Sequence, residues 1–407
     1  MKMIEGGITA PKGFMASSCA AGIKYQNRTD MAMIFSKTPC TSAGVYTSNR
    51  VKAACVQYDK QVTDGVNPVH AVVINAGIAN ACTGEQGLKV CAETAKAAGA
   101  ELSIPEGSVL VASTGVIGMQ LPVDRIVNGT VVLAETLEEG PEAGDRAAHA
   151  IMTTDTVDKQ VAVETTVGGK TVRVGGMCKG AGMIHPNMCT MLGFITTDCA
   201  VSKELLFKIL KEDVKDTFNM VSVDGDTSTN DTLVVLANGE AGNAKIESEG
   251  PDFEAFKEAF HTVTRTLARK MAADGEGATA LMEVSVVNAG SKESARKLAK
   301  SVICSNLTKA AIFGHDANWG RILCALGYSG EDFDPEKVTL SFSDGKESMV
   351  IFENGVATDY SEEKASTILS AKEVFITADM HMGKESATAY GCDLSYDYVK
   401  INADYRS

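Results

Sequence analysis

Two side chains that can act as nucleophiles, Cys189 and Thr190, stand next to each other near the middle of the chain. They follow the segment KGAGMIHPNM and precede an apolar run, MLGFIT. A threonine hydroxyl becomes reactive when a base takes its proton, and a threonine that begins a chain can use its own α-amine as that base. This amine has a pKa of about 7.7–8.0 in model peptides, so much of it is neutral near pH 8. The pair therefore suggests acyl transfer by a threonine that has been freed at its amino side.

Thr190 could free itself by cutting the peptide bond that precedes it. Its Oγ would attack the Cys189 carbonyl to give an ester, and water would then release the new amine. Gly180, Gly182 and Pro186 supply an approach loop in which backbone strain would help the attack. Two alternatives remain open. Thr190 is also a β-branched residue at the start of a strand, where threonine is common, and the Cys189 thiol, which ionises more readily than a hydroxyl, is a competing nucleophile.

Alternating strand and helix signals surround this pair. Residues 159–176 alternate apolar and polar side chains about a Gly-Gly step, which predicts a β-hairpin leading towards the nucleophiles. Thr83-x-x-Gln86 matches a capping box that opens a helix ending near Gly99. A strand within 107–118 is expected to run into a loop of small residues. The pattern further predicts strands at 70–77, 191–198, 338–345, 348–355, 373–379 and 386–394, and helices at 202–218, 252–271 and 292–307.

Length, composition and net charge limit the classes of protein to which the chain can belong. A length of 407 residues allows two or three domain-sized units or one large interleaved domain, and no linker marks a boundary. The mixture of signals indicates an α/β or α+β fold with mixed sheets. A net charge of −14 argues against a nucleic-acid surface. The 11 scattered cysteines, the absence of a signal-peptide pattern and the absence of a long apolar span predict a cytoplasmic protein with no membrane contact.

Several short motifs match only in part. GGKT at 168–171 ends like a phosphate-binding loop, but Glu164 stands where the first glycine is required, so a hairpin turn is the better interpretation. DGDTSTND at 224–231 begins like a calcium loop, but Thr229 and Val235 replace the required glycine and glutamate. The six histidines form no HExxH pattern and no close pair, so we expect no metal site.

The segment KGAGMIHPNMCTMLGFITTD, residues 179–198, resembles the cleavage motif of the ornithine acetyltransferase family, the bifunctional glutamate N-acetyltransferases of arginine biosynthesis. Members of that family cut themselves before a threonine in sequences resembling KGxGMIxPNMATML. Cys189 stands where the family usually has alanine. The resemblance extends over essentially the whole chain, through GGITAPKGF, ASTGVIG, TTDT, SVDGDTSTNDT, ADGEGATAL, GHDANWGRI and the terminal NADYRS.

The resemblance implies an activity and an architecture. Acetyl would pass from N2-acetyl-L-ornithine to Thr190 and then to L-glutamate in a ping-pong cycle, without a cofactor; whether acetyl-CoA is a second donor stays open. An α segment, 1–189, and a β segment, 190–407, would share one layered, mixed α/β fold like that of self-processing N-terminal-nucleophile enzymes, not a Rossmann fold. Two α and two β chains would form a heterotetramer. A self-processing aminopeptidase or amidase, and a metabolite-binding protein without activity, are the alternatives.

The resemblance also assigns site residues. Thr190 is the nucleophile, and the Thr114 hydroxyl and Gly115 N–H form the oxyanion hole. Lys179 suits the α-carboxylate of the substrate and Glu276 suits the δ-ammonium of ornithine. The remaining substrate contacts carried over are Thr153, Asn402 and Ser407. Asp224, Asp226, Asn230, Asn318 and Arg321 lie in family-like segments without an assigned task.

Overall fold

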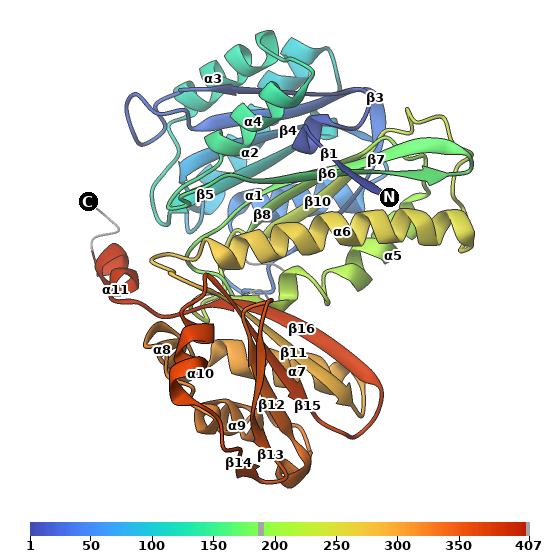
Figure 1. The fold of residues 1–407 in the computed structure, drawn as a ribbon. Helices are drawn as coiled ribbons and strands as arrows, with labels where there is room; N and C mark the ends of the chain where they lie inside the picture. The colour runs from blue at the N-terminus through green and yellow to red at the C-terminus, as the bar shows by residue number, and fades with distance from the viewer. Residues whose placement is uncertain (186–190, 404–407) are drawn as a thin grey trace. The chain divides into compact units, whose positions relative to one another are not determined.

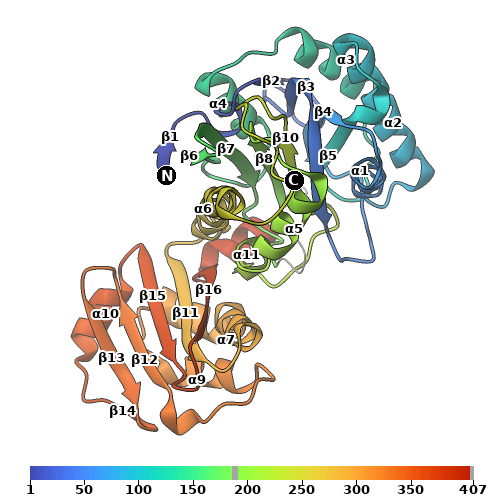
Figure 2. The ribbon, with the colours of Figure 1, turned by 90° about the vertical axis from the view of Figure 1, so that its right-hand side faces the viewer.

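A computed structural model of the chain describes residues 1–185 and 191–403 and separates them into two compact units. Unit 1 takes the described residues of 1–180, 186–218 and 227–267, and unit 2 takes those of 181–185, 219–226 and 268–407. Each unit is thus assembled from three stretches of chain. Figures 1 and 2 show the elements of each.

Unit 1 contains a mixed nine-stranded sheet, in which β8–β10 and β4–β5 pair in parallel and the other neighbours pair antiparallel. Two strands that follow the predicted cut in the sequence, β8 and β10, lie inside this sheet between β7 and β3, which precede it. The strand order is β1 (Lys2–Ile4), β6 (Lys159–Val167), β7 (Lys170–Lys179), β8 (Leu192–Thr197), β10 (Thr232–Ala237), β3 (Met31–Tyr46), β4 (Val69–Ile78) and β5 (Val109–Val116), with β2 (Phe14–Cys19) paired to β3.

The long strand β3 folds this sheet onto itself. Its register with β4 shifts between Phe35 and Cys40. Residues 31–35 and Cys40 pair with β4, and residues 41–46 pair with β10. Side chains of β4 then alternate between two cores: Val72 and Ile74 pack with Phe194 of β8, whereas neighbouring residues of β4 pack against the helices outside. Both faces of β4 are therefore buried, which confirms the continuous apolar strand predicted at 70–77.

Helices cover the two outer faces of unit 1. On the β4–β5 side lie α1 (Ala54–Asp64), α2 (Gly84–Leu102) and α3 (Val123–Glu135). On the opposite side lie α5 (Lys203–Asp213), which packs against β3, and the start of α6 (Pro251–Ala273), whose Val263 approaches Gly176 of β7. α4 (Pro141–Ala150) packs with the inner core. The result is a helix–sheet–sheet–helix arrangement, which Figures 1 and 2 show for α2, α3, α5 and α6.

Unit 2 is a second mixed sheet with helices packed against one face. α7 (Lys292–Cys304), α9 (Trp319–Gly327) and α10 (Glu362–Leu369) share one apolar core with alternate residues of the strands. α8 (Asn306–Phe313) and α11 (Tyr396–Ala403) complete the unit. The strand order is β14 (Val356–Ala357), β13 (Ser348–Glu353), β12 (Thr339–Ser343), β15 (Glu373–Asp379), β11 (Leu281–Ala289), β16 (Glu385–Cys392) and β9 (Val221–Ser222).

The secondary structure confirms most predicted elements and corrects their ends. The hairpin at 159–176 is present, and Gly168 and Gly169 both have positive φ, as a two-residue type I′ turn requires. The capping box is wrong: the Thr83 hydroxyl donates to Asn80 Oδ1 instead of capping α2, which runs three residues beyond Gly99. The helix predicted at 202–218 ends at Asp213.

Two further corrections concern where predicted elements end. The helix predicted at 292–307 divides at Ser305, whose hydroxyl caps α8 by accepting from Thr308 N–H. Thr114 and Gly115 lie within β5 and not in a loop after it. The oxyanion-hole candidates are therefore held by a strand ladder.

Candidate active site

Thr114 and Gly115 occupy the last part of β5, beside Gly77 at the end of β4. Thr114 is 9% exposed. Gly115 has φ of +133°, and a Cβ atom at this position would lie 2.2 Å from the Gly77 carbonyl carbon. Only glycine tolerates both the conformation and the contact. The two strand ends therefore meet more closely here than side chains would allow.

Lys179, the last residue of β7, brings two other predicted site residues together. Its Nζ donates to Thr153 Oγ1 at 2.8 Å and lies 3.4 Å from Thr114 Oγ1. The side chain is 9% exposed, so the ammonium group is largely shielded from water. The structure thus places Thr114, Thr153 and Lys179 in contact, although their roles remain predictions.

Two charged residues that the sequence did not single out complete this group. The Asp155 carboxylate accepts from Lys159 Nζ and from Gly180 N–H, both at 2.7 Å, and lies 3.9 Å from Lys179 Nζ. Burial alone would raise the pKa of Asp155, but the two lysines and these hydrogen bonds hold it well below its usual value. We call Thr114, Thr153, Asp155, Lys159 and Lys179 the lysine cluster. Its two ammonium groups and one carboxylate leave an excess positive charge, which favours an anionic ligand group.

Unit 2 contains a group of residues around the carboxylate of Glu276, in contrast to the positively charged lysine cluster. Glu276 is 7% exposed. Asn402 Nδ2 of α11 donates to Glu276 Oε2 at 2.8 Å. Gly182 lies so close that a Cβ atom there would be 2.2 Å from the same oxygen. The structure therefore places the predicted contacts Glu276 and Asn402 together, and the carboxylate retains capacity to accept from a cationic ligand group.

Asp224 fixes the segment that precedes the predicted cut. Its carboxylate accepts from Met183 N–H at 2.6 Å and from Ile184 N–H at 2.9 Å, and Tyr398 Oη lies 3.3 Å away. Val223 N–H donates to the Ile184 carbonyl at 2.7 Å. Asp224 thereby acquires a structural task that the sequence did not reveal. We call Gly182, Asp224, Glu276, Tyr398 and Asn402 the carboxylate cluster.

The other residues without an assigned task have local structural contacts. Asp226 N–H donates to Asp224 Oδ1. Asn318 caps α9 by accepting from Arg321 N–H, and Arg321 Nη1 donates to the Leu307 carbonyl at 2.9 Å. These contacts explain Asn318 and Arg321 as helix-end residues. Asn230 makes a different set of contacts and is considered below.

Cys189, Thr190 and Ser407 lie outside the described residues. The first described residue after Thr190 is Met191, which is 4% exposed and whose carbonyl accepts from Thr232 N–H at 2.8 Å. The strand that follows the predicted nucleophile is therefore anchored from its first residues. His185, the histidine nearest to Cys189 in sequence, contacts Ser222 Oγ at 3.1 Å, and burial together with Lys300 lowers its pKa to about 4.

Asp231 is a buried acid beside this strand, with 1% of its surface exposed. Within residues 1–185 and 191–403, no donor reaches either carboxylate oxygen in hydrogen-bonding geometry. Burial raises the pKa of Asp231 well above its usual value, and Ser228, Thr47, Lys179 and the Met191 N–H oppose this only in part. Burial thus disfavours the charged form of Asp231 beside the lysine cluster.

Across the described part of the chain, no group of three or more His, Cys, Asp and Glu side chains is placed to hold a metal ion. In the same residues, every helix is too short or too polar to traverse a bilayer.

Comparisons with known proteins agree with one another. Residues 15–407 match the ArgJ family. Arginine biosynthesis bifunctional protein ArgJ of Symbiobacterium thermophilum is 50% identical over 409 residues and covers 100% of both chains. The protein of that name from Listeria monocytogenes is 46% identical with the same coverage. A crystal structure of arginine biosynthesis bifunctional protein argJ from Bacillus halodurans is 43% identical, with a TM-score of 0.50, and covers 52% of this chain and 97% of that chain.

Proposed function

The chain belongs to the ArgJ family and is an acyltransferase of arginine biosynthesis, and we propose that it moves acetyl from N2-acetyl-L-ornithine to L-glutamate through an acetyl ester on Thr190. The family match favours this transfer over the aminopeptidase or amidase alternative, in which water would take the acyl group. The observation that carries the proposed chemistry is the lysine cluster. In this cluster the buried Lys179 ammonium group lies beside the Thr114 hydroxyl, and the cluster as a whole has an excess positive charge.

The proposed cycle begins with processing between Cys189 and Thr190. Thr190 Oγ attacks the Cys189 carbonyl carbon, the peptide nitrogen leaves as the new α-amine, and water hydrolyses the ester to give a Cys189 carboxylate and a free hydroxyl. The products are the α segment, 1–189, and the β segment, 190–407.

Acetyl transfer then uses the freed amine of Thr190 as the base. The amine takes the hydroxyl proton, Oγ attacks the acetyl carbonyl, and the oxyanion is stabilised by the Thr114 hydroxyl and the Gly115 N–H. Ornithine leaves with the proton. The glutamate amine next attacks the acetyl ester, which yields N-acetylglutamate and restores Thr190. Preorganised donors stabilise each oxyanion without reorganising at the moment of reaction.

The substrate contacts follow from charge. Lys179 binds the α-carboxylate, assisted by the Thr153 hydroxyl that it contacts at 2.8 Å. Glu276 and Asn402 receive the δ-ammonium of ornithine, with Ser407 as a further contact. Both substrates are small molecules. Two α and two β chains forming one heterotetramer, and a cytoplasmic location, complete the proposal; the described cysteines are all free thiols, as a reducing compartment requires.

One preparation tests both processing and transfer. Mass spectrometry of the purified wild-type protein should find two fragments meeting between Cys189 and Thr190, and incubation with acetylornithine and glutamate should give acetylglutamate and ornithine at equal rates. Thr190→Ala should remain one chain and lose the activity, whereas Cys189→Ala should retain both. A fully active, uncut wild-type chain, or release of acetate in place of acetylglutamate, would overturn the proposal. Acetyl-CoA with glutamate alone decides whether a second donor is used.

A further inference from the structure

Asn230 is a buried amide that bridges the ends of two strands. Its Nδ2 donates to the Ser113 carbonyl of β5 at 2.8 Å and to the Ala79 carbonyl, just beyond β4, at 2.5 Å. Its Oδ1 accepts from Thr229 Oγ1 at 2.6 Å. The side chain is 5% exposed. Both donors of the amide are therefore used, and the Thr229 contact fixes which edge of the amide faces the strands.

The contacts of Asn230 enclose Thr114 and Gly115 within a ring of hydrogen bonds. The Ser113 carbonyl, directly before Thr114, is held by the amide. The Val116 carbonyl, directly after Gly115, accepts from Ala79 N–H at 3.0 Å. The Ala79 carbonyl returns to the same amide. The Ser113 and Val116 carbonyls, one on each side of Thr114-Gly115, are thus linked to Ala79, the first through Asn230 and the second directly. The two residues therefore have little freedom to rotate.

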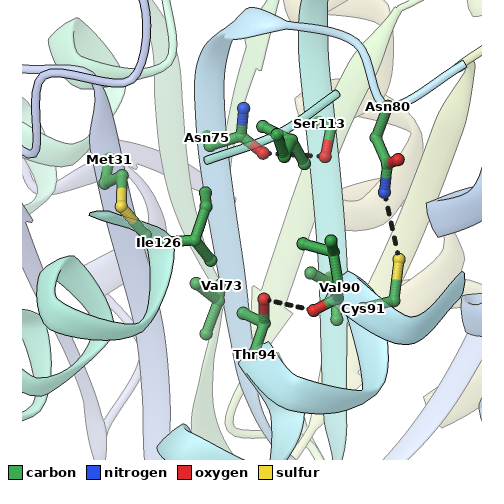
Figure 3. A pocket seen from close by; sticks show the side chains of 11 residues that line it. Met31, Val73, Asn75, Asn80, Val90, Cys91, Thr94, Ser113 and Ile126 are labelled. Carbon is green, nitrogen blue, oxygen red and sulfur yellow. Dashed lines mark hydrogen bonds between the residues drawn. The ribbon is translucent and has the colours of Figure 1, made fainter. Parts of the chain in front are cut away.

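The packing behind the strand ends supports the same conclusion. Ser113 Oγ donates to Asn75 Oδ1 at 2.7 Å, and Asn75 Nδ2 donates to the Ile78 carbonyl at 2.9 Å. Figure 3 shows the hydrogen bond between Ser113 and Asn75, two of the residues that line a small cavity. Its volume of about 10 Å³ is room for about one water molecule. Neither strand end can shift into this space without losing these bonds.

We propose that Asn230 is a positioning residue for acyl transfer: its amide ties the ends of β4 and β5 around Thr114 and Gly115 and so fixes the hydroxyl and N–H that receive the oxyanion. The inference rests on the proposed function, which assigns the oxyanion hole to those two residues. An oxyanion hole works through donors that are aimed before the reaction begins. Loss of the bridge should therefore weaken transition-state stabilisation more than substrate binding.

The chain supplies a matched control at the other end of β10. Asn238 follows this strand as Asn230 precedes it, and is 7% exposed. Its Nδ2 donates to the Lys12 carbonyl at 2.9 Å and to Ser36 Oγ at 3.2 Å, and its Oδ1 accepts from Glu240 N–H. It has the same number of donors and the same burial, but no bond to residues 113–116.

The experiment compares Asn230→Ala and Asn230→Asp with Asn238→Ala and Asn238→Asp in the full-length protein. The aspartate variants keep the volume of the side chain and remove both donors. Mass spectrometry first establishes that each variant is processed, and steady-state rates and single-turnover release of ornithine are then measured with acetylornithine. We expect both Asn230 variants to lose roughly 10- to 100-fold in kcat with KM changed by less than about 3-fold, somewhat less than the loss of one oxyanion donor. Both Asn238 variants should keep kcat within about 3-fold, with a similar fall in Tm.

Each outcome either supports or contradicts the positioning role of Asn230. Equal kcat losses at the two asparagines, a loss confined to KM, or processing that fails only in the Asn230 variants would each overturn it. Thr114→Val separates this outcome from failure of the proposed function, because loss of an oxyanion donor should lower kcat by about 100- to 1,000-fold. Wild-type transfer without a Thr114→Val effect would refute the oxyanion-hole assignment, whereas a strong Thr114→Val effect beside harmless Asn230 variants would refute only the bridge.

Discussion

The lysine cluster of unit 1 and the carboxylate cluster of unit 2 differ in how the fold holds them. Thr114 and Lys179 lie on strands of the sheet, and Asp155 is tied to the backbone at Thr153 and Gly180. Glu276 and its neighbours lie on loops and on α11, in which no side chain is buried. A strand-built site is fixed by its ladder, whereas a loop-built site can adjust. Changes to the lysine cluster should therefore affect folding or catalysis strongly, and changes to the carboxylate cluster should mainly affect substrate affinity.

Asp155→Asn should have the largest effect, because it removes the carboxylate that pairs with the buried Lys159 ammonium group at 2.7 Å. Breaking a buried pair in this way costs about 3–5 kcal/mol in the free energy of unfolding. Urea denaturation followed by circular dichroism measures it. Glu276→Gln serves as the comparison and should change stability by less than about 1 kcal/mol. Equal losses in the two variants would remove the distinction between the clusters.

The stabilisation from Asp155 should also depend on pH in a defined direction. Its pKa is lower in the folded protein than in the unfolded chain, so its contribution is fully present above the unfolded value, about pH 4, and is lost as pH falls further towards the folded value. The stability difference between wild type and Asp155→Asn should be constant from pH 5 to 7 and should shrink below about pH 4. A difference that grows on acidification would contradict the lowered pKa.

Lys179→Met should come next, with its effect on catalysis and not on folding. Asp155 keeps its hydrogen bond to Lys159 in this variant, but the proposed carboxylate partner is lost, at about 3 kcal/mol or roughly 150-fold in kcat/KM. Lys203→Met is a suitable control, because that lysine also lies in unit 1 but donates to the Gly65 carbonyl and is not part of the lysine cluster. A loss of the same size in both variants would argue against anion binding by the lysine cluster.

Glu276→Gln should raise KM for acetylornithine by about 10-fold, because it removes the negative charge of a largely buried carboxylate that is proposed to receive the δ-ammonium. KM for glutamate should change little, because that substrate has no δ-ammonium. Glu283→Gln, which alters a carboxylate paired with Arg269 in the same unit, is the control. If KM rises equally for both substrates, Glu276 does not distinguish them by charge.

Gly182→Ala should have the smallest effect. The new Cβ would meet Glu276 Oε2 at 2.2 Å, so the carboxylate must move aside, and a loop-built site should absorb this at a cost of about 3-fold in KM for acetylornithine. Gly290→Ala, with no atom within 4 Å of its new Cβ, should be silent. A loss of kcat larger than that of Lys179→Met would mean that the carboxylate cluster is the more rigid of the two.

Local sequence signals predicted the elements whose pattern and turn chemistry agree. The β6–β7 hairpin was identifiable because alternation on both sides meets two glycines with positive φ. The capping box predicted at Thr83 was wrong because the Thr83 hydroxyl donates to Asn80. A hydrogen bond to that position is not part of any helix-start pattern. β3 was missed because Pro39 and polar residues interrupt its middle, where the register shift lies.

The site was predictable only through resemblance, and only in part. Lys179 and Thr153 are 26 positions apart, and their contact depends on tertiary folding. Asp155 and Lys159 are four residues apart without lying on a helix, so spacing alone gave no sign of their buried pair. From the sequence alone Asn230 resembles an ordinary loop residue, because its partners at Ala79 and Ser113 are far away in the chain. Long-range polar partners of this kind have no short-range sequence signature.

The position of β8 and β10 between β7 and β3 has a consequence for a chain that is cut between Cys189 and Thr190 as proposed. The two fragments would be joined along both margins of this strand pair by ladders of six residue pairs each, β7–β8 and β10–β3. Separating them would require breaking both of these backbone hydrogen-bond ladders in the middle of the sheet. Fragments carrying different affinity tags should therefore fail to exchange when two mature preparations are mixed, and should part only in denaturant.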